Sequence, residues 1–430
     1  MKELATFKKF LEKIWLMSLL CTISLFSLGQ ATATDVTFYS NSLAMERHFQ
    51  IYLPEGYNEQ DSVRYPVVYF LHGGNSNHLS YSELLTVYND LIQSEEIQPS
   101  IIVKPDGSYP PWHGSWYTNS ELNGNFEDYI VYDLVDYIDS AYKTDPVKDK
   151  RAIMGNCIGG YGAMKLALKH PDLFCGVAAH SGLLNLRMCS LFVPSILSEN
   201  GGAPVSGYQP DAGLWTRGAF TAARALSPNL ANPPYFVDFP FDSMGNWIDS
   251  VWNRWSKENC PFLARSLSEE DSLAIYFDCG LQDEVNAYTF STSFADSLDQ
   301  LGIPYEFKSF DGGHSDKLAT RLPIALRFFD SLMNPPALDN IESKKFDQCT
   351  SIVYPNPSNS SITIEINNPA LIHYDLTIYT SLGRLVSTYE YTNSNQIEID
   401  VSSYDPGIYY YKLQNMGNRQ IANGKFIVEY

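Results

Sequence analysis

Residues 152–163 read AIMGNCIGGYGA, and this stretch decides which fold the chain is expected to adopt. The β-type run Arg151-Ala-Ile-Met154 leads into Gly155-Asn-Cys157-Ile-Gly159, and a helix-favouring run then continues until Pro171. At a sharp turn from a strand into a helix, neighbouring backbone comes so close that glycine is needed two positions before and two positions after the central residue. The pattern therefore predicts that the thiol of Cys157 is presented at the start of a helix.

The start of that helix would place unpaired N–H groups and the positive end of the helix dipole beside Cys157. Both lower the pKa of a thiol from its ordinary value of ~8.5 and stabilise a developing oxyanion. We expect the N–H of Ile158 to be one oxyanion donor, and the run Leu71-His-Gly-Gly74 supplies a second donor at Gly73 or Gly74. The sequence thus predicts Cys157 as a nucleophile beside an oxyanion hole.

An acid and a base follow in the order that this architecture requires. Asp283 comes shortly after one apolar strand, and His314 follows the next on a glycine-opened loop, Phe310-Asp-Gly-Gly-His314. Because the carboxyl ends of parallel strands meet at one crevice, we expect His314 to take the thiol proton and Asp283 to orient the imidazole. Asp278 and Glu284 are alternative acids. Ser181 is a weaker alternative nucleophile, because it lacks the glycine-framed turn.

The segment 34–333 alternates short β-type runs with helix-length segments. The β-type runs are His48–Leu53, Pro66–Leu71, Ser100–Val103, Arg151–Met154, Gly176–Ala179, Leu273–Phe277 and Tyr305–Phe310. This rhythm predicts an α/β fold with a mostly parallel sheet and helices on both faces. It breaks between 183 and 270, where Gly-, Pro- and Trp-rich sequence indicates an inserted lid. Trp116 and Trp252 are candidate substrate contacts, although packing beneath a lid is the commoner use of tryptophan.

A linker, 334–349, precedes a segment of different texture, 350–430. Its β-type runs, parted by turn residues, predict a small all-β sandwich without a nucleophile or a metal cluster. It resembles the C-terminal sorting domain of the type IX (Por) secretion system. The matching pieces are Tyr354-Pro-Asn-Pro357, Ser381-Leu-Gly-Arg384, Asp405-Pro-Gly-Ile-Tyr409 and Gly424-Lys-Phe-Ile-Val428. The resemblance implies passage across the outer membrane with the type IX machinery as a partner; an ordinary carbohydrate-binding module is the alternative.

The first 33 residues resemble a signal peptide. Lysines precede an apolar stretch, Ile14–Leu28, and Ala31-Thr-Ala33 offers a small-residue cleavage site. No other apolar run is long enough to cross a bilayer, so the mature chain is expected to have no membrane span. Together with the tail, the leader predicts a secreted or cell-surface protein.

Charge and cysteine content restrict the partners further. A formal net charge of −20 repels nucleic acid and suits a neutral or sugar-like substrate. No cofactor is expected, and no metal site, because no Cys/His spacing resembles a zinc site. Export permits disulfides, and the candidate pair is Cys189 with Cys260, both in the predicted lid.

The segment from about His48 to Met333 resembles the family D esterases, which include S-formylglutathione hydrolases, feruloyl and acetyl-xylan esterases, and mycolyltransferases. The motifs that carry the resemblance are Leu71-His-Gly-Gly74, Lys104-Pro-Asp-Gly107, Ser115-Trp-Tyr-Thr-Asn-Ser120, Arg151–Ala163, Lys169-His-Pro-Asp-Leu-Phe174, Asp278-Cys-Gly280 and Gly312-Gly-His314. The resemblance implies an α/β-hydrolase fold and hydrolysis of acyl esters without a cofactor. By motif position, the nucleophile, acid and base fall on Cys157, Asp283 and His314.

Cys157 departs from the family, which has serine at this position. The related dienelactone hydrolases place a cysteine in the same turn, so a thiol there is compatible with catalysis. The leading hypothesis is a secreted cysteine-nucleophile esterase acting on acylated polysaccharides or small acyl esters. The alternatives are an impaired pseudo-hydrolase that binds glycan or a partner, and an acyltransferase or thioesterase.

Overall fold

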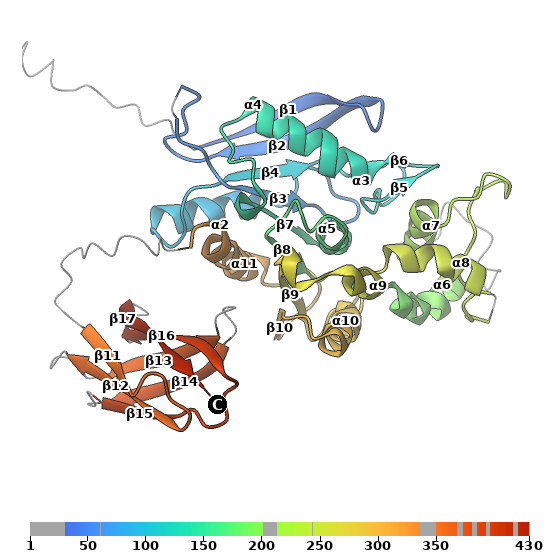
Figure 1. Cartoon of the computed structure of the whole chain (residues 1–430). Helices are drawn as coiled ribbons and strands as arrows, with labels where there is room; N and C mark the ends of the chain where they lie inside the picture. Colours follow the sequence, from blue (N-terminus) through green and yellow to red (C-terminus); the bar gives the residue numbers. More distant parts are fainter. Residues whose placement is uncertain are drawn as a thin grey trace, which may run out of the picture. The chain divides into compact units, whose positions relative to one another are not determined.

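The computed structural model describes residues 31–60, 62–200, 213–242, 244–335, 350–367, 373–380, 385–392, 396–415 and 420–429. The chain divides into two compact units, Met1–Pro335 and Pro336–Tyr430 (Figure 1). Most of the predicted signal peptide and linker lies outside the described residues; Thr32 and Ala33, at the end of the predicted leader, already belong to the first strand. Within the described part of the chain, no helix is both long and apolar enough to cross a membrane.

An eight-stranded sheet forms the centre of the first unit. Its strands, in spatial order, are β1 (Thr32–Ser40), β2 (Met45–Leu53), β4 (Ile101–Pro105), β3 (Val67–Leu71), β7 (Arg151–Asn156), β8 (Gly176–His180), β9 (Ala274–Gly280) and β10 (Glu306–Phe310). The pairs β1–β2 and β2–β4 are antiparallel, and the other five are parallel. The predicted mostly parallel α/β fold is confirmed, and β1 is a strand that the pattern did not indicate.

Helices cover both faces of this sheet (Figure 1). They are α2 (Ser82–Gln93), α3 (Phe126–Asp128), α4 (Val135–Ala141), α5 (Ile158–Lys169), α10 (Ala287–Leu301) and α11 (Leu318–Met333). Side chains of a strand alternate between faces, and β3 shows this: Val67, Tyr69 and Leu71 join the core under α4, α5 and α10. Val68 and Phe70 join the separate core under α2 and α11. The sheet is therefore buried on both sides.

The predicted lid, 183–270, is mainly helical where it is described. It contains α6 (Val193–Glu199), α7 (Leu214–Leu226), α8 (Asp249–Trp255) and α9 (Cys260–Leu263). The guessed Cys189–Cys260 disulfide is wrong, because both thiols are free. Each is buried in the apolar core, where cysteine behaves as a small hydrophobic residue.

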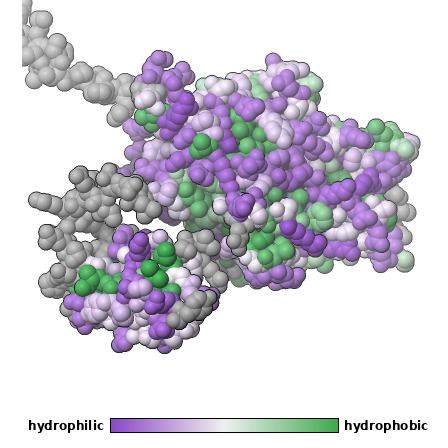
Figure 2. All heavy atoms as spheres, in the orientation of Figure 1, coloured by the Kyte–Doolittle hydropathy of each residue, from purple (hydrophilic) through white to green (hydrophobic). Residues whose placement is uncertain are grey.

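The second unit contains two antiparallel sheets. One is β11 (Thr350–Tyr354), β12 (Ser361–Asn367) and β15 (Gln396–Asp400); the other is β14 (Leu385–Thr392), β13 (His373–Thr380), β16 (Gly407–Asn415) and β17 (Gln420–Val428). Buried residues of both sheets, including Ile364, Leu376 and Phe426, form one apolar cluster. The prediction of a small all-β domain is thus confirmed. Figure 2 shows hydrophilic residues over most of the visible face of the first unit, and apolar residues gathered in places on the second.

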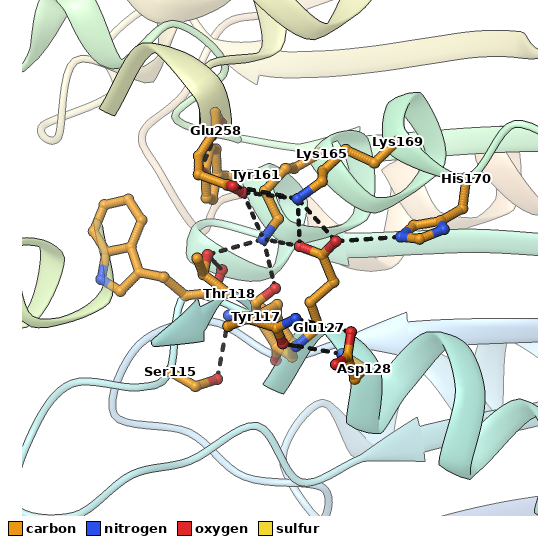
Figure 3. Close-up of polar contacts among 12 residues, drawn as sticks. Ser115, Tyr117, Thr118, Glu127, Asp128, Tyr161, Lys165, Lys169, His170 and Glu258 are labelled. Atoms are coloured by element: carbon orange, nitrogen blue, oxygen red, sulfur yellow. Dashed lines mark hydrogen bonds and ion pairs between the residues drawn. The ribbon is translucent and has the colours of Figure 1, made fainter. Parts of the chain in front are cut away.

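A buried charge cluster fixes α5 within the first unit (Figure 3). The Lys165 ammonium donates to the carbonyl of Tyr117 at 2.6 Å and to Oε2 of Glu127 at 3.2 Å, and it lies 3.3 Å from a carboxylate oxygen of Glu258. Lys169 contacts the same two carboxylates. Burial alone would raise the pKa of Glu127, but Lys165 and the groups around it hold that pKa well below its ordinary value.

Replacing Lys165 with methionine should lower the free energy of unfolding by about 3 kcal/mol, because the buried carboxylate of Glu127 would lose its fully buried cation and share Lys169 with the partly exposed Glu258. Urea unfolding of both proteins measures the difference. Lys169→Met is the matched control: that side chain is 25% exposed, Lys165 would remain, and the loss should stay below about 1 kcal/mol. Equal losses in the two variants would contradict this account of the cluster.

Candidate active site

Cys157 occupies the sharp turn between β7 and α5. Its φ is 58°, a value that non-glycine residues adopt mainly where the surroundings impose it. A Cβ on Gly155 would lie 2.3 Å from the carbonyl oxygen of Gly159, and a Cβ on Gly159 would lie 2.0 Å from the carbonyl oxygen of Leu71. Both positions therefore require glycine, for the steric reason that the motif spacing indicated.

Backbone hydrogen bonds hold the turn at Cys157 in place. The N–H of Cys157 donates to the carbonyl of His180 at the end of β8 (2.9 Å), and the carbonyl of Cys157 accepts from Tyr161 in the first turn of α5 (3.0 Å). These bonds leave the side chain at the carboxyl edge of the sheet, where the loops after β9 and β10 also begin. The thiol is therefore fixed between two strands and a helix.

Asp283 and His314 meet on those two loops. The imidazole donates from Nδ1 to Oδ2 of Asp283 at 2.8 Å, and both residues are buried, with 9% and 8% of their surface exposed. The other carboxylate oxygen, Oδ1, accepts from the backbone N–H of Val285 (2.9 Å) and that of Ala287 (3.3 Å), the first residue of α10. The carboxylate is thus held by the start of a helix, and it holds the ring in one tautomer.

The opposite nitrogen of His314, Nε2, is buried and has no nitrogen or oxygen partner among the described residues. The thiol of Cys157 lies close enough to this ring for each group to shift the pKa of the other. Burial would lower the pKa of His314, but Asp283 and Cys157 outweigh it and raise the pKa to about 10. The structure therefore brings Cys157, His314 and Asp283 together in the predicted order.

Backbone donors converge on the sulfur. Burial would raise the pKa of the Cys157 thiol, but His314 and the N–H groups of Ile158 and Gly74 hold it below its ordinary value. In each of the other four described cysteines burial raises the thiol pKa. Cys157 is therefore the cysteine in the described chain that most favours the thiolate.

His72 sets the orientation of the second donor. Its Nδ1 donates to the carbonyl of Gly73 at 2.8 Å, while its Nε2 accepts from the N–H of Gly107 at 2.9 Å. Because a trans peptide points its C=O and N–H in opposite directions, fixing the Gly73 carbonyl aims the N–H of Gly74 toward Cys157. The N–H of Gly73 instead donates to the hydroxyl of Tyr81 at 3.3 Å. Of the two predicted glycines, Gly74 faces the sulfur.

With this geometry in view, relatives can be compared. A family model described as putative esterase matches residues 40–318, about two thirds of the chain. The chain belongs to this esterase family. A second model, the secretion system C-terminal sorting domain, matches residues 352–429 of this esterase-family protein. The sorting domain indicates export, so the protein is secreted or displayed at the cell surface.

Individual relatives agree with the family. An esterase of Mycobacterium tuberculosis is 28% identical over 290 residues, which cover 64% of this chain and 54% of that protein. An endo-1,4-beta-xylanase/feruloyl esterase of Xylanibacter ruminicola is 30% identical over 149 residues, which cover 33% of this chain and 20% of that protein. The chain thus spans about half the length, or less, of these curated relatives. A solved ferulic acid esterase, at 22% identity, covers 71% of this chain and 99% of its own, with a TM-score of 0.51, and supports the fold.

The alternative acids and the alternative nucleophile have other partners in this esterase-family structure. Glu284 accepts from the backbone N–H of His314 at 2.9 Å, so it contacts the loop and not the ring. Asp278 pairs with His180 and Arg321. Ser181 is fully buried, and its hydroxyl donates to the carbonyl of His314 at 2.8 Å. Asp283 is therefore the acid that contacts the imidazole, and the Ser181 hydroxyl is engaged elsewhere.

The two predicted substrate-contacting tryptophans pack against other rings. Trp116 is 4% exposed, stands edge-on to Tyr161 with ring centroids 5.3 Å apart, and has a buried Nε1 without a partner among the described residues. Trp252 packs on Trp247 (4.6 Å) beneath the guanidinium of Arg187. Both arrangements match the packing role that was the commoner alternative, and a contact with substrate stays a prediction.

One group of possible metal ligands occurs in the described residues. Donor atoms of Asp35, His48 and His78 lie within 4.8 Å of one another. They already have partners: Nε2 of His78 donates to Asp35 at 3.0 Å, and Nδ1 of His48 bonds to the hydroxyl of Thr37 at 2.9 Å. Nδ1 of His78 is buried without a partner in the described part of the chain, whereas metal-bound imidazoles usually donate from that second nitrogen. The chemistry of this group does not favour a metal.

Alkylation by iodoacetamide should report the Cys157–His314 pair directly. In the wild-type protein the rate should reach half its maximum below the ordinary thiol value of ~8.5. In His314→Ala the midpoint should move upward past that value, because burial still disfavours the thiolate while the cationic partner is lost. Mass spectrometry of the Cys157 peptide over a pH series measures both. An unchanged midpoint in His314→Ala would show that the two side chains do not interact.

Proposed function

We propose that this protein hydrolyses carboxylic esters with Cys157 as nucleophile, His314 as general base and acid, and Asp283 as the residue that orients the imidazole. The observation that carries the proposal is the position of His314: its buried Nε2, which has no nitrogen or oxygen partner among the described residues, lies beside the Cys157 thiol, whose pKa is lowered. A thiolate is the nucleophilic form of cysteine. The pair is thus arranged to attack an acyl carbon.

The reaction would proceed in two halves. The Cys157 thiolate attacks the ester carbonyl, and the N–H groups of Gly74 and Ile158 stabilise the resulting oxyanion. The C–O bond then breaks, the protonated His314 donates its proton to the leaving alkoxide, and the acyl group remains on sulfur as a thioester. His314 next takes a proton from water, and the resulting hydroxide attacks the thioester carbonyl. The C–S bond then breaks, the carboxylic acid leaves, and the thiolate and protonated His314 of the starting state are restored.

The substrate we propose is an acylated polysaccharide or a small acyl ester. A relative's name includes feruloyl esterase, and the sorting domain indicates export, so the substrate would be met outside the cytoplasm. The negative net charge of −20 also disfavours strongly anionic macromolecules. We also propose that the sorting domain binds the type IX secretion machinery.

A thioester intermediate also permits acyl transfer to an alcohol in place of water, which makes an acyltransferase the second candidate. Product analysis separates the two. Release of free acid in the presence of glycerol or oligosaccharide supports the hydrolase, and formation of a new ester supports the transferase. Glycan binding without turnover would instead favour the impaired pseudo-hydrolase.

Turnover of p-nitrophenyl acetate should disappear in Cys157→Ala and in His314→Ala. In Asp283→Asn it should fall on the order of 10³-fold or more, because the ring would lose its tautomer and its stabilised cation. Initial rates at pH 7 measure these effects.

Cys175→Ala is the matched control. It removes another free thiol, but one that is buried and whose pKa burial raises to about 11, so turnover should match the wild type. Retained turnover in both Cys157→Ala and His314→Ala would contradict the proposed function.

A further inference from the structure

A second buried charged group lies behind His314. Asp278, near the end of β9, and Arg321, on α11, are 2% and 3% exposed. Nη2 of Arg321 donates to Oδ1 of Asp278 at 2.6 Å, and Nε donates to the same oxygen at 3.0 Å. The hydroxyl of Tyr276 donates to the other carboxylate oxygen at 2.9 Å. Burial would raise the pKa of Asp278, but His180 and Arg321 lower it to about 2, so the pair stays ionised.

The rest of the guanidinium points at the loop that carries the base. Nη2 of Arg321 also donates to the hydroxyl of Ser181 at 2.9 Å, and Nη1 donates to the carbonyl of Asp316 at 3.2 Å. Ser181 connects Arg321 to the base, because its hydroxyl also donates to the carbonyl of His314 at 2.8 Å. The backbone N–H of His314 is held by Glu284. Both polar backbone groups of His314 are therefore fixed.

The same group of residues reaches the nucleophile turn. Nδ1 of His180 donates to Oδ2 of Asp278 at 2.9 Å, and the carbonyl of His180 accepts from the N–H of Cys157 at 2.9 Å. Ser181 donates its backbone N–H to the carbonyl of Asp278 at 2.7 Å and has a φ of 48°. A left-handed non-glycine residue is strained unless its surroundings determine it. The network therefore links the backbone of Cys157 to the backbone of His314 through side chains that the reaction itself does not use.

We propose that Arg321 and Ser181 are positioning residues that set the distance between the Cys157 thiol and the His314 ring. A buried ion pair by itself stabilises a fold little more than apolar residues of the same size would. Arginine, however, presents several donors in a rigid planar group. Here those donors contact Asp278 on β9, the hydroxyl of Ser181 and the carbonyl of Asp316 on the loop that carries His314. The expected change in kcat rests on the proposed function, whereas the expected change in the alkylation midpoint of Cys157 does not.

Ser181→Ala removes the shorter of the two bonds to the His314 carbonyl, and it keeps the Arg321–Asp278 pair and the longer bond from Nη1 of Arg321 to that carbonyl (3.5 Å). We expect kcat on p-nitrophenyl acetate to fall on the order of 10-fold to 10²-fold, with KM nearly unchanged, because the base is misplaced while the substrate site is intact. The alkylation midpoint of Cys157 should move to higher pH, between those of the wild type and His314→Ala.

Ser227→Ala is the matched control. Ser227 is equally buried, donates to the carbonyl of Asp238 at 2.6 Å and accepts from Nε1 of Trp255 at 2.8 Å. Each variant loses one bond to a backbone carbonyl and one from a side-chain N–H, although the donor is a neutral indole for Ser227 and a guanidinium for Ser181. The bonds of Ser227 do not reach the loop that carries His314. This variant should show a comparable decrease in thermal stability and an unchanged alkylation midpoint.

Arg321→Lys gives an independent measurement. A lysine keeps the charge beside Asp278 but cannot hold Ser181 and the Asp316 carbonyl at once, so the midpoint should rise as in Ser181→Ala while the fold is retained. If both variants keep the wild-type midpoint and kcat, or if the Ser227→Ala midpoint moves equally, the positioning role is wrong. A wild type that alkylates with a low midpoint but hydrolyses no ester would overturn the proposed function and leave the positioning role to be decided by the midpoints.

Discussion

The close approach of backbone around Cys157 is the constraint on which the rest of the site depends. With Gly159 packed against Gly155 and Leu71, the chain must reverse direction at Cys157 with a left-handed φ. That reversal places the sulfur at the start of α5 and beside the loop that holds Gly74. The N–H groups of Gly74 and Ile158, the imidazole and the sulfur then lie close together.

A thiol in this volume differs from a serine in its resting state. Because the His314 pKa is raised and the Cys157 pKa is lowered, the resting pair favours a thiolate beside an imidazolium. A serine hydroxyl would instead stay neutral until substrate arrived. The cysteine therefore changes the charge on the pair before substrate binds, while the proposed acid, base and backbone donors keep the arrangement expected from the sequence.

The sequence predicted the features that depend on local steric limits and on the positions of strand ends. The sharp turn at Cys157 follows from Gly155 and Gly159, and the positions of the proposed acid and base follow from their place after strands. It missed β1, an edge strand of mostly exposed residues that depends on pairing with β2. It also missed Arg321 and Tyr81, whose hydrogen bonds join segments that lie far apart in the sequence. One feature of the sequence could have indicated Arg321: it is a charged residue on the apolar face of α11, between Leu318 and Leu322. No neighbouring sequence feature distinguishes Tyr81.

The most direct test is to trap the acyl group. Wild-type protein mixed with p-nitrophenyl acetate, quenched in acid within the first turnovers and digested, should carry one acetyl group on the Cys157 peptide. Hydroxylamine should remove that group, as it does a thioester. Turnover with no acetyl group on Cys157, or with the acetyl group on Ser181 or another residue, would contradict the account of Cys157 as the nucleophile.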